Sequence, residues 1–256
     1  TGYEEAAAQG LMAGINASQF ATGNQPLIIT RDQAYLGVMT DDLITKGVGG
    51  EPYRMFTSRA EYRLVLREDN ADIRLRKIGF EIGLVSDLEH QSFLDKMEMI
   101  ESLKNRSKSV RLKFSKSALL DSLSDRMSIK NYQDMSLDQV IRWPVIQVSD
   151  LQNHWDEFAC NFDFDHEAVS SFLSELKYEG YIQRYQKQIE KMKFYDIIKI
   201  PSSLKFDDVS SLSSEVREKL SFHKPQTLGE ALRIPGITPA AVSHLEIHIT
   251  NLRKTA

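Results

Sequence analysis

The segment between Asp165 and Pro201 constrains the fold more than any other part of the sequence. Its apolar residues recur at the spacing of one helix face: Val169, Phe172, Leu173, Leu176, Tyr181, Ile182, Tyr185, Ile189 and Met192. This spacing predicts one long amphipathic helix, which Asp163 or Asp165 can cap and which ends before Pro201. Gly180, in its middle, allows a bend or a close crossing. A chain organised around such a helix is expected to be mainly α.

Most other segments also carry helix signals. Ser86 followed by Glu89 is a capping box, and it predicts a helix that runs to about Arg106. Further helices are predicted over residues 31–46, 70–79, 213–220, 227–234 and 238–252. Residues 106–147 show no clear pattern, and a short strand or two is expected around residues 63–66.

The first eighteen residues also have the pattern of a helix. Thr1 can cap it, and Glu4 and Glu5 lie in its first turn, where the helix dipole favours acids. Gly10 and Gly14 share one face, which allows close packing against a neighbour. Because a domain seldom starts on such a helix, we expect it to be the last helix of a larger domain.

Composition excludes several classes of protein. The chain has 256 residues, of which 41% are hydrophobic, and its net charge of −4 argues against a wholly basic nucleic-acid binder. No apolar run is long enough to span a membrane, and no signal segment is recognised. Cys160 is the only cysteine, so no internal disulfide is possible and a reducing compartment such as the cytoplasm is expected.

Four arginines follow one another closely in residues 52–67, and aromatic residues are interleaved with them. The arginines are Arg54, Arg59, Arg63 and Arg67, and the aromatic residues are Tyr53, Phe56 and Tyr62. Guanidinium groups bind phosphate through two parallel hydrogen bonds, and both guanidinium groups and aromatic rings stack on unpaired bases. The segment therefore has the composition of an RNA-binding surface. It is also compatible with a helical turn braced by pairs with Glu61, Glu68 and Asp69, and composition leaves both interpretations open.

Other motifs give weaker signals. His244 and His248 are four residues apart, but no third ligand is evident, so no metal site is predicted. Residues 234–245 resemble a helix-hairpin-helix, although Thr238 stands where the second glycine of that motif is required. Cys160 has the surroundings of a small core residue, and no catalytic residue is predicted in this chain.

The exact order of residues in several segments is more specific than their composition. It resembles the glucose-inhibited division protein A family, the FAD-dependent tRNA uridine 5-carboxymethylaminomethyl modification enzymes. The resemblance is carried, in the family's order, by residues 1–10, 13–17, 34–48, 51–72, 178–182, 212–220 and 238–241. It is weakest between about residues 105 and 165. The resemblance implies the C-terminal part of such an enzyme.

The family implies a helical C-terminal domain preceded by the last helix of a truncated FAD-binding α/β domain. Residues 1–20 would be that helix, and residues 21–85 a connector with the arginine-rich, tRNA-facing region. Residues 86–200 would form the helical domain, and residues 201–256 a small helical bundle that docks a partner. Thr1, Gly2 and Tyr3 would lie near the flavin, and Arg54, Arg59, Arg63 and Arg67 would bind tRNA.

The family also implies the chemistry of the parent protein. With FAD, NADH and a GTPase partner of the MnmE/TrmE type, it would install a carboxymethylaminomethyl-type group at C5 of the wobble uridine. The parent would be a cytoplasmic homodimer. Because the catalytic residues belong upstream of this chain and the flavin site is incomplete, the chain by itself is expected to be inactive.

Two alternatives remain open at this point. In the first, the chain is a helical protein–protein module in which Arg54 and Arg63 are buried against acids such as Asp41 or Asp42. In the second, it is an isolated hairpin-type DNA binder. The polar side of the long helix, with Lys177, Arg184, Lys187, Lys191 and Lys193, is either an ordinary solvated face or a further set of tRNA contacts.

Overall fold

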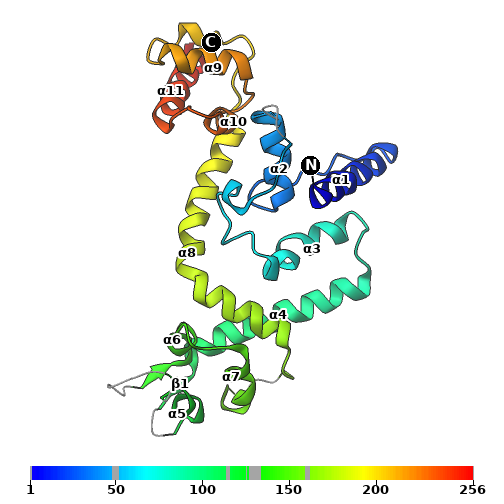
Figure 1. Ribbon diagram of the computed structural model, residues 1–256, viewed down its shortest axis with the longest axis vertical. Coiled ribbons are helices and arrows are strands. Elements are labelled where there is room, and N and C mark those ends of the chain that lie inside the picture. Colours follow the sequence, from blue (N-terminus) through cyan, green and yellow to red (C-terminus); the bar gives the residue numbers. More distant parts are fainter. Residues whose placement is uncertain are drawn as a thin grey trace. The chain divides into compact units, whose positions relative to one another are not determined.

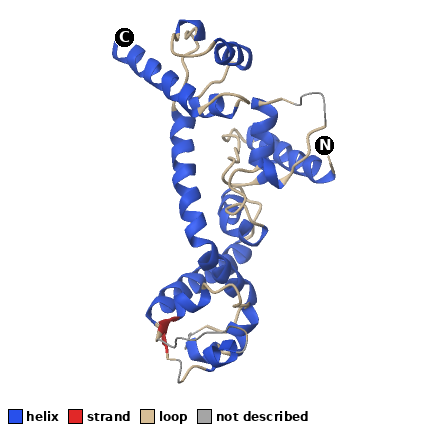
Figure 2. Cartoon of the chain, turned by 60° about the vertical axis from the view of Figure 1, so that its left-hand side comes forward, coloured by secondary structure: helices blue, strands red, loops and turns tan. Residues whose placement is uncertain are grey.

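The computed structural model describes residues 2–47, 52–113, 116–124, 126, 134–158 and 162–255. It confirms the predicted mainly α fold, as Figures 1 and 2 show. Among these residues the only paired strands are β1 (Arg111–Leu112) and β2 (Met135–Ser136), which are antiparallel. The strand expected around residues 63–66 is wrong. The backbone N–H groups of Val65 and Leu66 both donate to the carbonyl of Tyr62 and close a turn there.

The chain divides into two compact units, and the boundary within the long helix α8 falls after Gln183. The first unit holds residues 1–66 and 184–256, and the second holds residues 67–183. The first contains α1 (Tyr3–Ala21), α2 (Tyr35–Thr45), η1 (Thr57–Arg59), η4 (Phe206–Asp208), α9 (Ser214–His223), α10 (Leu228–Arg233) and α11 (Pro239–Thr255). The second contains η2 (Glu68–Asn70), α3 (Ala71–Glu81), α4 (Asp87–Ser109), α5 (Ala118–Ser124), α6 (Leu137–Ile141), α7 (Val148–Asn153) and η3 (Trp155–Phe158).

The long helix α8 spans His166–Ile197 as predicted, and Asp165 Oδ1 accepts a hydrogen bond from Ala168 N at its start. Gly180 does not make the close crossing that the sequence allowed, because a Cβ atom there would meet nothing within 4 Å. The first half of α8 packs on the core of the second unit through Val169, Phe172 and Leu176. The capping box of Ser86 and Glu89 starts α4 in that unit.

In the first unit, the end of α8 joins a small bundle made of α9, α10 and α11. Its core includes Tyr195, Leu220, Leu228, Leu245 and Ile249. The three predicted starts are confirmed, because Ser213, Thr227 and Thr238 each accept a hydrogen bond from the backbone N–H three residues later.

A second, smaller core of the first unit joins α2 to the segment that follows it, through Val38, Ala60 and Leu66. Helix α2 begins at Tyr35 rather than directly after Thr30, because residues 30–33 form a separate turn and the extended backbone of Ala34 follows it as the N-cap. The N-cap of α1 is Gly2, so the predicted cap by Thr1 is wrong. No helix in the described part of the chain is long and apolar enough to cross a membrane.

Candidate nucleic-acid interface

Residues 52–66 form an irregular segment held down by buried side chains. It contains the 3₁₀ turn η1 and a turn at residues 62–66. Of the acids expected to brace the arginines, Asp69 pairs with Arg67, whereas Glu61 pairs with Arg31. Tyr53, Ala60, Tyr62 and Leu66 are buried and anchor the segment at intervals. The charged residues between these anchors are exposed. The anchors hold the backbone, so an irregular segment still presents its charged residues at defined positions along the surface.

The four predicted arginines are not equivalent. Arg54, Arg59 and Arg63 are exposed, and the guanidinium of Arg59 lies 4.6 Å from the centre of the Tyr53 ring. Arg67 belongs to the other unit, where its Nε lies 2.9 Å from Asp69 Oδ1 and its guanidinium lies over the ring of Tyr178. Arg67 is therefore already engaged, whereas the other three present their charge to solvent.

An exposed aromatic ring accompanies the three arginines. The side chain of Phe56 is 60% exposed, although it is among the larger apolar residues of the segment. An exposed ring beside exposed guanidinium groups can stack on an unpaired base while the arginines bind phosphate. The arrangement has the two components that binding of single-stranded RNA requires.

Arg54 lies beside the start of α1. A Cβ atom on Gly2 would come within 2.4 Å of Arg54 Nη1, so the end of this side chain lies against the start of α1. Glu5, in the first turn of α1, accepts a hydrogen bond of 2.9 Å from the backbone N–H of Met55, and this bond lowers the pKa of Glu5. Residues 52–66, which we call the arginine segment, are thus attached to the helix end that carries the predicted cofactor residues Gly2 and Tyr3. Thr1 lies outside the described residues.

Sequence reasoning missed Arg31, which braces the segment. Its side chain is only 10% exposed, and its guanidinium lies 2.9 Å from Asp41, 2.8 Å from Asp42 and 2.6 Å from Glu61. These bonds join the turn before α2, the helix itself and the arginine segment. The bracing role that Arg54 and Arg63 would have in a protein–protein module therefore belongs to Arg31.

Asp42 is the centre of this network. It is 1% exposed and accepts hydrogen bonds from Arg31, from Lys46 and from the hydroxyl of Tyr53. Burial alone would raise the pKa of Asp42, but the three hydrogen bonds outweigh it and hold that pKa below its ordinary value. The ionised network therefore stabilises the folded chain fully at any pH above the ordinary pKa of an aspartate. This stabilisation is lost as the pH falls through the lowered pKa of Asp42.

The same network reaches the small bundle of the first unit. Arg233 at the end of α10 lies 2.8 Å from Asp41 and 2.9 Å from Asp196 of α8. Lys193 of α8 lies 2.8 Å from Asp32. A groove between these elements has a volume of about 1030 Å³, and its charged lining is largely taken up by these pairs. The ion pairs that line the groove therefore hold these elements together, and their charged groups are not available to bind a ligand.

No group of three or more metal-ligating side chains is found in the described part of the chain. His244 and His248 lie on α11, where neither forms part of such a group. Cys160 lies outside the described residues. The arginine segment is therefore the site with the clearest chemistry.

Three parts of the chain match known families. Residues 1–25 match the family described as Glucose inhibited division protein A. Residues 87–186 match the tRNA modifying enzyme MnmG/GidA C-terminal helical domain, and residues 188–256 match the C-terminal helical bundle of the same enzyme.

Individual relatives agree with these matches. The tRNA uridine 5-carboxymethylaminomethyl modification enzyme MnmG of Syntrophotalea carbinolica is 47% identical over 96% of this chain and 39% of the relative. The enzyme of the same name from Nitratiruptor sp. is 47% identical over 97% of this chain and 39% of the relative. The structure of Aquifex aeolicus GidA in its form II crystal has a TM-score of 0.75 and 39% identity, over 97% of this chain and 38% of that one.

The chain thus spans about two fifths of the length of these relatives, and it matches them almost from its first residue to its last. The matched family regions lie in the order that the sequence resemblance indicated. The chain belongs to the MnmG/GidA family, of which it represents the C-terminal part.

Proposed function

We propose that this chain is the tRNA-binding and partner-docking part of an enzyme that modifies tRNA uridine. The observation that carries the proposal is the exposure of Arg54, Arg59 and Arg63 beside Phe56 on an anchored segment. The planar guanidinium groups suit bidentate binding of phosphate, and the exposed ring of Phe56 can stack on a base. The relatives are tRNA uridine modification enzymes, and this supplies the class of RNA.

The finer chemistry belongs to the parent protein. There we propose FAD near Gly2 and Tyr3, with Thr1 beside them, and NADH as the reductant. No side chain of the N-cap residue closes the N-terminus of α1, and a helix N-terminus suits an electron-rich ring edge or an anion. Arg54 lies beside this helix end, so RNA held by Arg54 would be close to the bound cofactor.

We further propose that the bundle in residues 201–256 docks a GTPase partner, that the parent is a cytoplasmic homodimer and that the target is C5 of the wobble uridine. The side chain of Phe222 on α9 is 81% exposed, and Ile247 on α11 is also exposed. These two side chains supply exposed apolar area that a docked partner would cover.

The two alternatives have less support in the structure. A module braced by Arg54 and Arg63 would bury them, but the acids Asp41 and Asp42 pair with Arg31, Lys46 and Arg233 instead. In the hairpin-like segment, the hydroxyl of Thr238 caps α11 by accepting a hydrogen bond from Ala241 N, which makes Thr238 an ordinary helix start.

Titration of the chain with unmodified tRNA over a series of salt concentrations tests the proposal. The Arg54→Ala, Arg63→Ala double variant is expected to bind more weakly, and its slope of log K against log salt should be smaller by about 0.7–0.9 for each phosphate that it no longer neutralises. The matched control is Lys77→Ala, Lys219→Ala, which removes the same charge from two ion pairs on helix surfaces. An equal weakening in this control, or binding by the unaltered chain that does not depend on salt, would contradict the proposed role of the arginines.

A further inference from the structure

One face of α8 carries a row of positive charge that the arginine segment does not explain. Arg184, Lys187 and Lys191 follow one another at intervals of three and four residues, and all three are exposed. Residues at this spacing lie above one another on one helix face. We call these three residues the α8 stripe.

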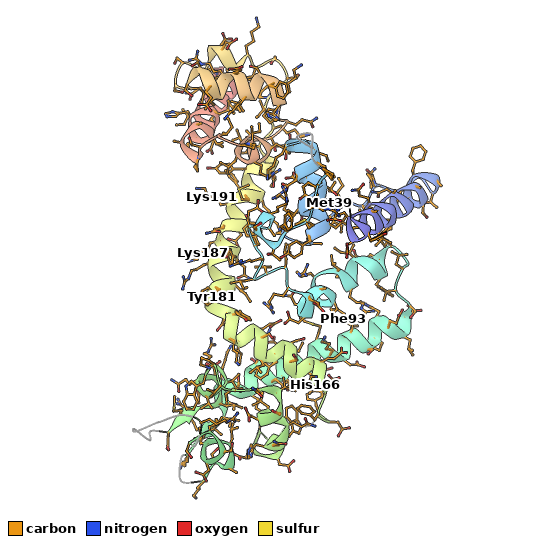
Figure 3. All side chains as sticks on the ribbon, in the orientation of Figure 1. Met39, Phe93, His166, Tyr181, Lys187 and Lys191 are labelled. Carbon is orange, nitrogen blue, oxygen red and sulfur yellow. The ribbon has the colours of Figure 1, made fainter. Side chains whose placement is uncertain are left out.

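The α8 stripe points away from the rest of the first unit. Tyr185 packs edge-on against Tyr62 with ring centres 6.0 Å apart, and the buried Ile189 lines the groove beside α2. Because Ile189 is two residues from both lysines, it lies on the opposite side of the helix. Figure 3 likewise shows Lys187 and Lys191 on the side of α8 away from Met39 of α2.

The charge of the two lysines is not neutralised locally. Neither Lys187 nor Lys191 forms an ion pair in the part of the chain that the structure describes; Lys191 lies 5.8 Å from the centre of the Tyr195 ring. Glu190 is the one acid between residues 180 and 195. In a chain of net charge −4, this is a local concentration of positive charge.

Its dimensions and flanks suit a nucleic-acid backbone. Seven residues of helix separate Arg184 from Lys191, a rise of about 10 Å, which equals the axial length of about three phosphates on one strand of a duplex. Tyr181 and Phe194, which are 52% and 56% exposed, lie near the two ends of the α8 stripe. Exposed rings next to cations favour RNA over an acidic protein surface, because they can also stack on bases or pack on ribose.

We propose that the α8 stripe is a second RNA-binding surface, which holds the phosphate backbone of a different part of the RNA from the one at the arginine segment. This inference rests on the proposed function. Because Tyr62 packs against the other side of α8, the arginine segment and the stripe face different directions, and we expect them to hold different parts of a bound RNA. A folded tRNA, with two arms, is large enough to contact both.

The test compares two RNAs, an unmodified tRNA and its isolated anticodon stem–loop. The Lys187→Gln, Lys191→Gln variant is expected to bind the whole tRNA more weakly by about tenfold or more, because each lysine that is removed loses a charge-assisted contact to phosphate. Its affinity for the stem–loop should stay unchanged, whereas Arg54→Ala, Arg63→Ala should weaken the binding of both RNAs. Lys187→Arg, Lys191→Arg should restore binding of the whole tRNA, and unchanged circular dichroism checks that α8 stays folded.

Unchanged binding of whole tRNA by the glutamine variant would overturn the inference. The stripe would then be an ordinary solvated face or a binding surface for an acidic protein. Equal weakening with both RNAs would also overturn it, because the two surfaces would then hold the same part of the RNA. Weaker binding by the stripe variant, with unchanged binding by the arginine variant, would overturn the proposed role of the arginine segment and support the stripe. The control is Lys77→Gln, Lys108→Gln, which removes two other exposed lysines and should leave both affinities unchanged.

Discussion

Replacing Asp42 with alanine is expected to cost the first unit about 3–5 kcal/mol of stability, the usual cost of breaking a buried ion pair from one side. The variant leaves the buried guanidinium of Arg31 with one fewer acceptor and removes the partner of the Tyr53 hydroxyl. Both residues lie beside or within the arginine segment. Hydrogen exchange of the backbone amides in α2 measures the effect, because these amides report the opening of the helix that carries Asp42.

The matched control is Lys193→Ala, which breaks an ion pair whose lysine is 58% exposed. Its expected cost is about 0–1 kcal/mol, because solvent screens an exposed pair. Tryptophan fluorescence serves as a check on the other unit, because Trp143 and Trp155 both lie there. A cost for Asp42→Ala no larger than that of the control would mean that the buried network does not stabilise the unit.

Replacing Gly37 with alanine is the second change with a large expected effect. A Cβ atom at this position of α2 would lie 2.2 Å from the carbonyl oxygen of Thr30 and 2.6 Å from that of Ile29. Both atoms belong to the backbone, so the connector that carries Arg31 must move away from the helix. We expect destabilisation of about 1–3 kcal/mol or more, as for other overpacked positions, and faster hydrogen exchange in α2.

The same substitution at Gly10 of α1 provides the opposite control. Nothing lies within 4 Å of a Cβ atom there, so alanine should stabilise the helix by up to about 1 kcal/mol through its higher helix propensity. If Gly37→Ala were as harmless as Gly10→Ala, the close approach of the connector to α2 would be contradicted.

The helices were predictable because their signals are local. The capping residues Ser86, Ser213 and Thr227 act on a backbone N–H three residues away, and the apolar period of α8 repeats within a single helix. The two-residue strands β1 and β2 gave no such signal, because an alternating pattern needs a longer stretch. Residues 106–147 also hold the short helices α5 and α6, which are seven and five residues long and therefore too short to show an apolar period. The capping box of Ser136 and Gln139 at the start of α6 was a local signal that sequence reasoning missed.

The arginine segment was predictable in composition but not in arrangement. The partners of Arg31 are ten, eleven and thirty residues away in the sequence, so no short motif reveals them. One signal was present: Asp42 follows Val38 and Met39 at helical spacing, which puts a carboxylate on the buried face of α2 and demands a cation. The different role of Arg67 also had a local signal, because Asp69 follows it by two residues.

Crosslinking from the target nucleotide tests the central claim most directly. A tRNA that carries 4-thiouridine at the wobble position and no other modified nucleotide would be irradiated in the presence of the chain. The crosslinked peptides would then be identified by mass spectrometry. We predict crosslinks within residues 52–66, with Phe56 among the sites, and their disappearance in the Arg54→Ala, Arg63→Ala variant. Crosslinks confined to the bundle in residues 201–256, with none in residues 52–66, would contradict the account.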